Sequence, residues 1–162
     1  MVYQFQHATS SLDSALLGSG QQPVPVIMYL YTHAFFMTYH VTANIVLRRL
    51  NSFIQPLAVP LYSLMFMLFV FLIGYSWAWI ETKAMANPLM ADLFYYEKMD
   101  LMLKYGSVIY ASYFIASFPI YYFIDEDAER PWSWWQVISG ALAASTLTFF
   151  MLDTAVHIIE TL

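Results

Sequence analysis

The chain has 162 residues, of which 60% are hydrophobic and only 10% are charged. Soluble domains usually carry about 25% charged residues, so this composition indicates one membrane-embedded domain. The 11 acidic residues against 6 basic ones argue against nucleic acid as a partner, and the absence of cysteine excludes disulfides and thiolate metal ligands.

In chain order, the sequence begins with a polar arm over residues 1–24, which lacks the basic start and short apolar run of a signal peptide. Four apolar blocks follow, at about 26–47, 57–80, 105–124 and 134–157. Each block is near the ~20 residues that a helix needs to cross the hydrocarbon of a bilayer. Because lipid cannot satisfy a bare backbone, we predict an all-α integral membrane bundle of four transmembrane helices over residues 25–162.

Polar side chains share one face of the first predicted helix. At ~100° per residue, spacings of four and seven residues return to the same side of a helix, and this face carries Tyr29, His33, His40, Asn44 and Arg48. Such a stripe is costly in lipid, so we expect it to face protein or a cavity. Two interpretations stay open: hydrogen bonds between packed helices, or a ligand cavity or catalytic site.

The alternation of helices assigns the remaining polar groups to one half of the membrane or the other. One half should gather His33, Glu81, Asp153 and His157, with His40 nearer mid-depth. The other half should gather Arg48, Arg49, Asp125, Glu126 and Asp127, most simply as a layer of ion pairs at helix ends. The first set fits a proton-transfer site, because burial lets a carboxyl stay protonated as an acid. The alternative for Glu81 is an ordinary charge at a helix end.

Several other chemistries lack their sequence signatures. Membrane di-iron enzymes need clusters of many histidines, whereas this chain has four. It has no GxSxG elbow, no glycine-rich phosphate loop and no HExxH motif. Single helical histidines are weak evidence for a bound haem or chlorophyll. We therefore expect no metal site and no cofactor.

Several runs of the sequence resemble the cycloeucalenol cycloisomerase family. The runs are HAFFMTYHVTANIVLRRL over 33–50, WIETKAMAN over 79–87, FYYE over 94–97 and GSVIYASYFIASFP over 106–119, followed by Asp125-Glu126, Trp132 and Asp153. The resemblance covers about residues 29–153. It implies an isomerase that opens the cyclopropane ring of a cyclosterol by proton transfer, in an apolar slot with aromatic faces that stabilise a cation.

Carried onto this sequence, the resemblance implies two groups of site residues. The candidate proton donors and acceptors are Glu81, Asp125 and Asp153 as acids, with His40 and His33 as bases. The candidate substrate-binding residues are Asn44, Trp79, Asn87, Tyr95, Tyr96, Tyr110 and Tyr113. The expected partner is a sterol or other membrane lipid, and the expected membrane is the endoplasmic reticulum if the chain is a eukaryotic sterol enzyme.

The sequence also departs from the family pattern. Family members are longer and carry further membrane helices before the matched part, so we interpret the chain as a truncated homologue. Extra residues lie between Asn87 and Leu93, and Gly140 stands where an acidic residue is expected. A second hypothesis therefore stays open, in which the chain is a non-catalytic integral subunit of a larger membrane complex that contacts lipid or pigment.

Overall fold

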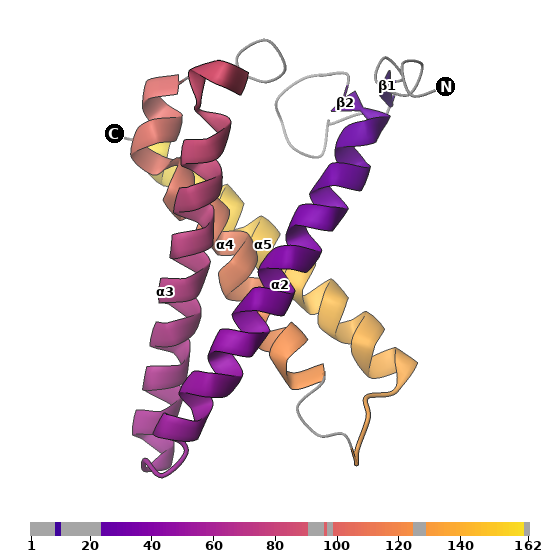
Figure 1. Cartoon of the computed structure of the whole chain (residues 1–162), viewed down its shortest axis with the longest axis vertical. Coiled ribbons are helices and arrows are strands. Elements are labelled where there is room, and N and C mark those ends of the chain that lie inside the picture. The colour runs from indigo at the N-terminus through magenta and orange to yellow at the C-terminus, as the bar shows by residue number, and fades with distance from the viewer. Residues whose placement is uncertain (1–8, 11–23, 91–95, 97–98, 125–128, 161–162) are drawn as a thin grey trace. The chain divides into compact units, whose positions relative to one another are not determined.

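The computed structural model describes residues 9–10, 24–90, 96, 99–124 and 129–160. Its elements, labelled in Figure 1, are β1 (Thr9–Ser10), β2 (Val24–Pro25), α2 (Val26–Ile54), α3 (Val59–Met85), η2 (Pro88–Met90), α4 (Met99–Ile124) and α5 (Trp134–Glu160). The four long helices confirm the predicted all-α class. Each coincides with one of the apolar blocks, although α3 begins two residues inside its block, and each continues beyond its block at one end through residues that are more polar.

Three of the four long helices are long and apolar enough to cross a membrane. These are α3, α4 and residues Trp134–Ala155 of α5. Helix α2 has the length, with 29 residues, but His33, His40 and Asn44 make it more polar than the other three. The membrane character of the chain thus rests on three helices by length and composition, and a crossing by α2 stays a prediction.

The chain divides into two compact units, and the boundary falls within α2. The first unit, Met1–Val41, holds a short antiparallel pair in which Thr9 lies opposite Pro25 and Ser10 lies opposite Val24. This pair was not predicted from the sequence of the polar arm. Strand β2 leads directly into the first part of α2, where the rings of Phe35 and Tyr39 stack with centroids 6.5 Å apart.

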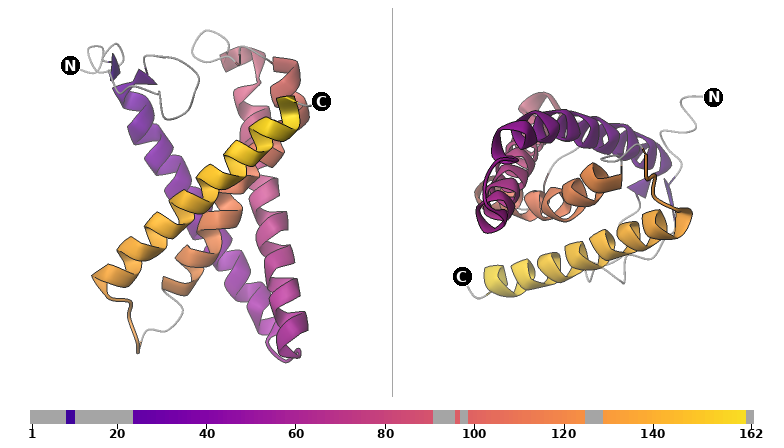
Figure 2. Two further views of the ribbon diagram at one scale, coloured as in Figure 1. Left: turned by 180° about the vertical axis from the view of Figure 1, so that it is seen from behind. Right: turned by 90° about the horizontal axis from the view of Figure 1, so that it is seen from below.

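The second unit, Thr42–Leu162, is built on the packing of α3 against α4 and of α4 against α5 (Figure 2). On α3, every fourth residue is buried: Phe66, Val70, Gly74, Ala78 and Thr82. On α4, the matching fourfold series is Gly106, Tyr110, Phe114, Phe118 and Tyr122, of which all but the half-buried Tyr110 are buried. Ridges of this spacing interlock between helices, and small residues let the two backbones approach closely.

Three contacts fix the antiparallel register of α3 and α4. A Cβ built on Gly74 would lie 3.0 Å from the Cβ of Phe114, and one built on Gly106 would lie 3.3 Å from Cγ2 of Thr82. At the other end, the rings of Phe66 and Tyr122 have centroids 5.2 Å apart. The same register puts Tyr110 opposite Ala78, one turn of α3 before Thr82.

Local sequence signals account for where the helices begin and end. Pro60 lies in the first turn of α3, where its missing N–H costs nothing. At the far end of α3, the Asn87 side chain accepts a hydrogen bond from the Leu89 N–H at 3.0 Å and starts a turn. Helix α5 starts with a capping box, because the Ser133 N–H donates to Oε1 of Gln136 at 2.8 Å and the Gln136 N–H donates to Oγ of Ser133 at 3.4 Å.

The turn between α2 and α3 is held by side chains from both helices. Tyr62 donates a hydrogen bond from its hydroxyl to Oδ1 of Asn51 at 2.8 Å. The guanidinium of Arg48 lies 5.5 Å from the centroid of the Tyr122 ring, which is within cation–π range. These contacts join the last turns of α2 to α3 and α4 within the second unit.

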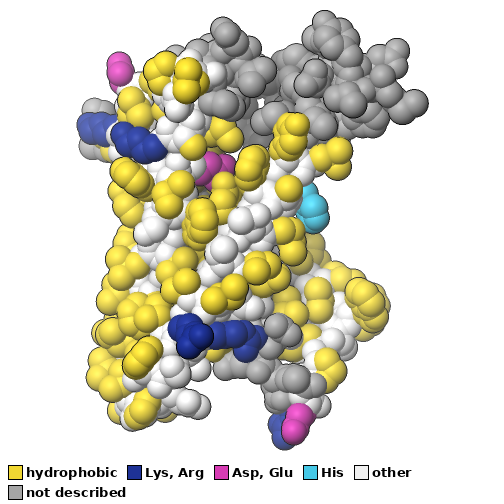
Figure 3. All heavy atoms as spheres, viewed as in Figure 1, with side chains coloured by type: hydrophobic (Ala, Val, Ile, Leu, Met, Phe, Trp, Pro, Cys, Tyr) yellow, Lys and Arg dark blue, Asp and Glu magenta, His cyan; other side chains and the backbone are white. Residues whose placement is uncertain are grey.

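Apolar side chains cover the outward face of α3 along its length, as the space-filling view in Figure 3 shows. The exposed hydrophobic residues of this helix are Val59, Leu61, Leu64, Met67, Leu68, Phe71, Leu72, Tyr75, Trp79 and Ile80. An apolar helix face of this extent suits contact with lipid tails.

Candidate functional site

Glu81 lies one turn before the end of α3, and its side chain is half-buried, with the Oε2 atom completely shielded from solvent. Its neighbour Thr82 is only 1% exposed and donates a hydrogen bond to the Ala78 carbonyl at 2.8 Å. Thr82 packs on Gly106, so α3 and α4 approach closely beside the carboxyl group. Glu81 is therefore a partly shielded acid beside the contact of two apolar helices.

Two phenols share the environment of Glu81. Tyr96 lies between η2 and α4, and Tyr110 lies one turn beyond Gly106 on α4. Both phenols lie within electrostatic range of Glu81, and the side chains of Tyr96 and Tyr110 lie close enough to influence one another. The three residues come from separate stretches of the chain, and we call them the Glu81 cluster.

Tyr96 lies outside the three apolar spans, and its environment favours the neutral phenol. Burial raises the pKa of the Tyr96 hydroxyl above its ordinary value. The hydrogen bond with Tyr110 lowers the pKa of Tyr96, and the negative charge of Glu81 raises it. Since the net direction is upward, Tyr96 keeps its proton at neutral pH and can serve as a hydrogen-bond donor.

Tyr113 extends the aromatic wall along α4. Its ring centroid lies 6.4 Å from that of Tyr110, with 41° between the ring planes. Rings arranged in this way present π faces and edges next to the carboxyl cluster. Of the tyrosines predicted together with Glu81, Tyr96 and Tyr110 lie within electrostatic range of the carboxyl group, and Tyr113 lies next to Tyr110.

Asn44 is a second buried polar group of the second unit. Its Oδ1 atom is shielded from solvent and has no hydrogen-bond partner among the residues that the structure describes. A buried amide oxygen without a partner is costly, and such groups often bind a ligand hydroxyl or a water molecule. Asn44 therefore stays a candidate for substrate binding.

The two histidines of α2 belong to the first unit. His33 is exposed, whereas His40 is half-buried and its ring stacks on Phe36 with centroids 6.2 Å apart. The Nδ1 atom of His40 lies 2.7 Å from the Phe36 carbonyl oxygen, which can only accept, so Nδ1 carries the proton. In the neutral ring this places the lone pair on Nε2, the atom that would act as a base.

Several other predicted site residues lie elsewhere. Trp79 is 49% exposed on α3. Asn87 is also exposed, and its side-chain oxygen accepts the hydrogen bond from the Leu89 N–H that forms the turn. Asp153 and His157 are both exposed on α5, where Nδ1 of His157 donates to the Asp153 carbonyl at 3.1 Å. Tyr95, Asp125, Glu126 and Asp127 fall outside the described residues. Arg48, predicted in a layer of ion pairs, contacts the ring of Tyr122.

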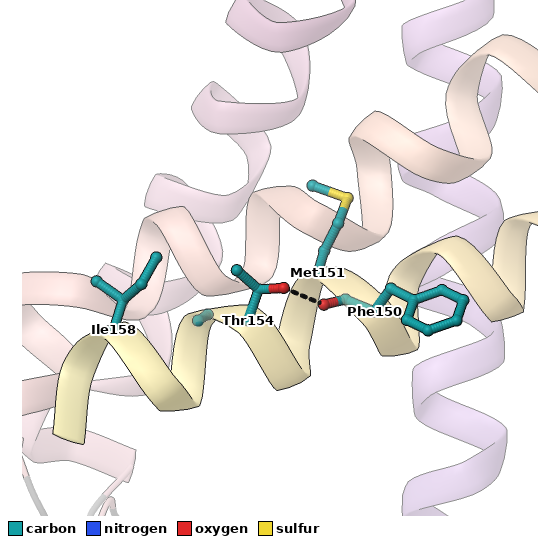
Figure 4. A pocket seen from close by; sticks show the side chains of 5 residues that line it. Phe150, Met151, Thr154 and Ile158 are labelled. Carbon is teal, nitrogen blue, oxygen red and sulfur yellow. Dashed lines mark hydrogen bonds between the residues drawn. The ribbon is translucent and has the colours of Figure 1, made fainter. Parts of the chain in front are cut away.

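A hollow of about 320 Å³ lies on α5 and is lined by Phe150, Met151, Thr154, Ala155 and Ile158 (Figure 4). Its one polar side chain, Thr154, donates to the Phe150 carbonyl of its own helix at 2.7 Å. No member of the Glu81 cluster lines it. Within the described part of the chain, no group of three or more His, Cys, Asp and Glu side chains could hold a metal ion.

The sequence analysis did not assign a role to Gly106 or Thr82, although both lie in runs that carry the family resemblance. The structure shows that their contact brings α4 against α3 beside Glu81. The signal available in the sequence was Gly106, a small residue four positions before Tyr110 in the apolar block that follows Glu81.

Comparison with known proteins supports the resemblance seen in the sequence. The chain is 36% identical over 133 residues to a curated cycloeucalenol cycloisomerase from Arabidopsis thaliana. The matched region covers 80% of this chain and 45% of the relative, so the chain spans less than half of that protein's length. No family model matches the chain, and no solved structure matches it.

Proposed function

Because this chain is a homologue of cycloeucalenol cycloisomerase, we propose that it is a membrane-embedded isomerase that opens the cyclopropane ring of a cyclosterol by proton transfer. The observation that carries this proposal is the burial of Oε2 of Glu81, in the shared environment of Tyr96 and Tyr110, at the junction of two apolar helices. A polycyclic lipid would reach this site from the bilayer in which the helices lie.

The proposed reaction moves one proton onto the substrate and takes one proton off. The Glu81 carboxyl gives its proton to the cyclopropane methylene, and the electron pair of the breaking ring bond forms the new C–H bond. The methylene becomes a methyl group, and a tertiary cation remains on the ring skeleton. A base then removes a proton from an adjacent carbon, and that C–H electron pair becomes the double bond of the product. The product is an isomer, so no oxidant or reductant is consumed.

The groups around Glu81 fit the demands of this chemistry. The first step needs the carboxyl group in its protonated form, so the proposal requires Glu81 to hold a proton when the substrate binds. The rings of Tyr96, Tyr110 and Tyr113 offer π faces, which attract a cation more strongly where water is excluded. Protein dipoles fixed around the developing charge lower the barrier without reorganisation.

The resemblance names His40 and His33 as candidate bases, and both belong to the first unit. The hydrogen bond from Nδ1 of His40 to the Phe36 carbonyl leaves Nε2 of the neutral ring able to accept a proton. His40 is half-buried and His33 is exposed, so His40 is the better shielded of the two candidates. Asn44, whose Oδ1 is shielded and unpaired among the described residues, is proposed to bind a polar group of the sterol.

The test is the conversion of a cyclopropyl sterol by the purified full chain in liposomes, with the product identified by mass spectrometry and NMR. Glu81→Gln keeps the size and polarity of the side chain but removes the transferable proton. We expect turnover to fall by about 100-fold or more, the scale of a lost general acid. The matched control is Asp100→Asn, which neutralises an exposed carboxyl on α4 and should leave turnover unchanged.

The possible results separate the candidate functions. Full activity of the Glu81→Gln variant would reject Glu81 as the acid. A correctly folded wild-type chain with no activity on cyclopropyl sterols would reject the isomerase proposal. If such an inactive chain also copurified with other membrane proteins in fixed stoichiometry, the result would favour the subunit hypothesis.

A further inference from the structure

Helix α5 begins with two tryptophans at the boundary between a charged connection and an apolar span. Trp134 and Trp135 are the first two residues of α5, and Trp134 is also the first residue of the apolar span Trp134–Ala155. Their side chains are 84% and 77% exposed, so neither ring belongs to the core. Glu129 and Arg130, which precede them in the connection, are exposed and charged. The two rings therefore lie where the chain passes from polar to apolar residues.

The start of α5 is held in place by contacts on both sides of the pair. Ser133 and Gln136 close the first turn through their capping box. The ring of Trp132 is half-buried, and a Cβ built on Gly140 would lie 3.3 Å from Cζ3 of this ring and 3.0 Å from Cγ2 of Ile120 on α4. Trp132 thus packs back on α5 beside α4, whereas the next two tryptophans remain exposed.

Basic side chains lie at the same end of the second unit. Arg48 contacts the ring of Tyr122, two residues before the end of α4, and its neighbour Arg49 is exposed. Because Ile120 meets Gly140, the end of α4 lies beside the start of α5. The arginines of α2 and the tryptophans of α5 are therefore at one end of the apolar helices. Basic and tryptophan side chains gather in this way at membrane–water interfaces.

We propose that Trp134 and Trp135 anchor the start of α5 in the headgroup layer of the bilayer. An indole ring suits this layer, because its apolar body fits among the upper parts of the acyl chains while its N–H donates to lipid oxygens or water. The exposed phenylalanines of α5, Phe149 and Phe150, have no polar group and lie within the apolar span. The order of Trp and Phe along α5 thus matches the change from headgroups to acyl chains.

A lipid surface fits the pair better than a partner protein, because the outward side of α5 is prepared for lipid. The exposed hydroxyls of Ser145, Thr146 and Thr154 each donate to a carbonyl of their own helix, so they need no partner outside it. A helix that faces hydrocarbon must satisfy its polar groups internally in this way. Anchors of this kind set the tilt and depth of a helix, and the inference does not depend on the proposed function.

The test is the quenching of tryptophan fluorescence by brominated phospholipids in liposomes that contain the full chain. One lipid carries bromine near the carbonyl end of its acyl chain, and the other carries bromine near the methyl end. The difference in emission between wild type and Trp134→Phe/Trp135→Phe isolates the pair among the five tryptophans. We expect this difference to be quenched at least about twofold more strongly by bromine near the carbonyl end.

The matched control is Leu142→Trp, added to the double Phe variant on the same helix. Leu142 is 64% exposed and lies two turns farther into the apolar span, so the added ring should be quenched more strongly by bromine near the methyl end. Both native rings are exposed, so their replacement leaves the core untouched. If circular dichroism shows a loss of helix in the double variant, the single variants Trp134→Phe and Trp135→Phe give the same comparison.

Three results would overturn the anchor. Quenching of the pair that is equal or stronger with bromine near the methyl end would place the rings among the acyl chains. The absence of quenching by both lipids would place them in water or beneath a partner protein. A ring introduced by Leu142→Trp that neither lipid quenches would show that α5 does not face lipid.

Discussion

Gly74 of α3 and Phe114 of α4 meet so closely that a Cβ on Gly74 would lie 3.0 Å from the Cβ of Phe114. Two turns farther along the helix pair, Gly106 makes a similar close approach to Thr82 beside Glu81. The two glycines set the separation of α3 and α4, and this separation decides whether residues of α4 can reach the carboxyl group. The packing of α3 against α4 therefore also sets the geometry of the candidate site.

The first prediction compares Gly74→Ala with Gly106→Ala. At Gly74 the new Cβ meets another Cβ and, at 3.8 Å, the backbone nitrogen of Ile115, neither of which can rotate away. At Gly106 the nearest atom, at 2.8 Å, is Cε of Met102, the flexible end of a side chain. We expect Gly74→Ala to lower the free energy of unfolding by about 1–3 kcal/mol, the usual cost of overpacking, and Gly106→Ala to cost less.

The measurement is unfolding of the reconstituted or detergent-solubilised chain, followed by circular dichroism. Ser76→Ala, at an exposed position of α3, controls for general effects of alanine in that helix. Equal stability of Gly74→Ala and Ser76→Ala would contradict the close contact between Gly74 and Phe114.

A second prediction concerns the ionisation of Tyr96. Burial raises the pKa of its phenol in the folded chain above the ordinary value of 10.0. The folded state therefore binds this proton more tightly than the unfolded state. The resulting contribution to stability is fully present below the ordinary pKa and is lost as the pH rises toward the folded pKa.

Titration of the tyrosinate absorbance in wild type and Tyr96→Phe isolates this residue among the 13 tyrosines. We expect the difference between the two curves to appear above pH 10, and the stability of Tyr96→Phe to fall less steeply than that of wild type over the same range. Tyr75→Phe serves as the comparison, since it removes an exposed phenol. A difference curve centred below pH 10 would show that Tyr96 is not shielded.

A third prediction concerns the crossing of the membrane by α3. This helix has 27 residues and a length of about 40 Å, which exceeds the thickness of the hydrocarbon layer. The native chain has no cysteine, so Gln55→Cys and Lys83→Cys each introduce a single thiol at an exposed position near one end of α3. In sealed vesicles, an impermeant thiol reagent should label these two positions from opposite sides. We expect the side of Gln55, near Arg48 and Arg49, to be cytoplasmic.

Labelling of both positions from the same side would show that α3 does not cross. Prior permeabilisation of the vesicles should make both thiols reactive, which controls for burial of either position.

The four long helices could be predicted from local sequence, because each rests on a continuous apolar block, with local signals such as Pro60 and the Ser133–Gln136 capping box at the helix starts. The sequence also determined the relationship to cycloeucalenol cycloisomerase, since the matching runs are continuous in the chain. Apolar blocks did not mark the true helix ends, because helices continue through polar residues for as long as their backbone hydrogen bonds are formed. This explains why α4 begins at Met99 rather than near Tyr105.

Which polar residues lie near one another depends on how the helices pack, and this could not be predicted from the sequence. Trp79 and Glu81 are two residues apart, but positions so spaced on a helix point in nearly opposite directions, and Trp79 is exposed while Glu81 is half-buried. Tyr110 is far from Glu81 in sequence, yet the register of α3 and α4 puts it opposite Ala78, one turn of α3 from Thr82 and within electrostatic range of Glu81. That register depends on the fit of Gly74 to Phe114 and of Gly106 to Thr82, which is a property of two surfaces in contact.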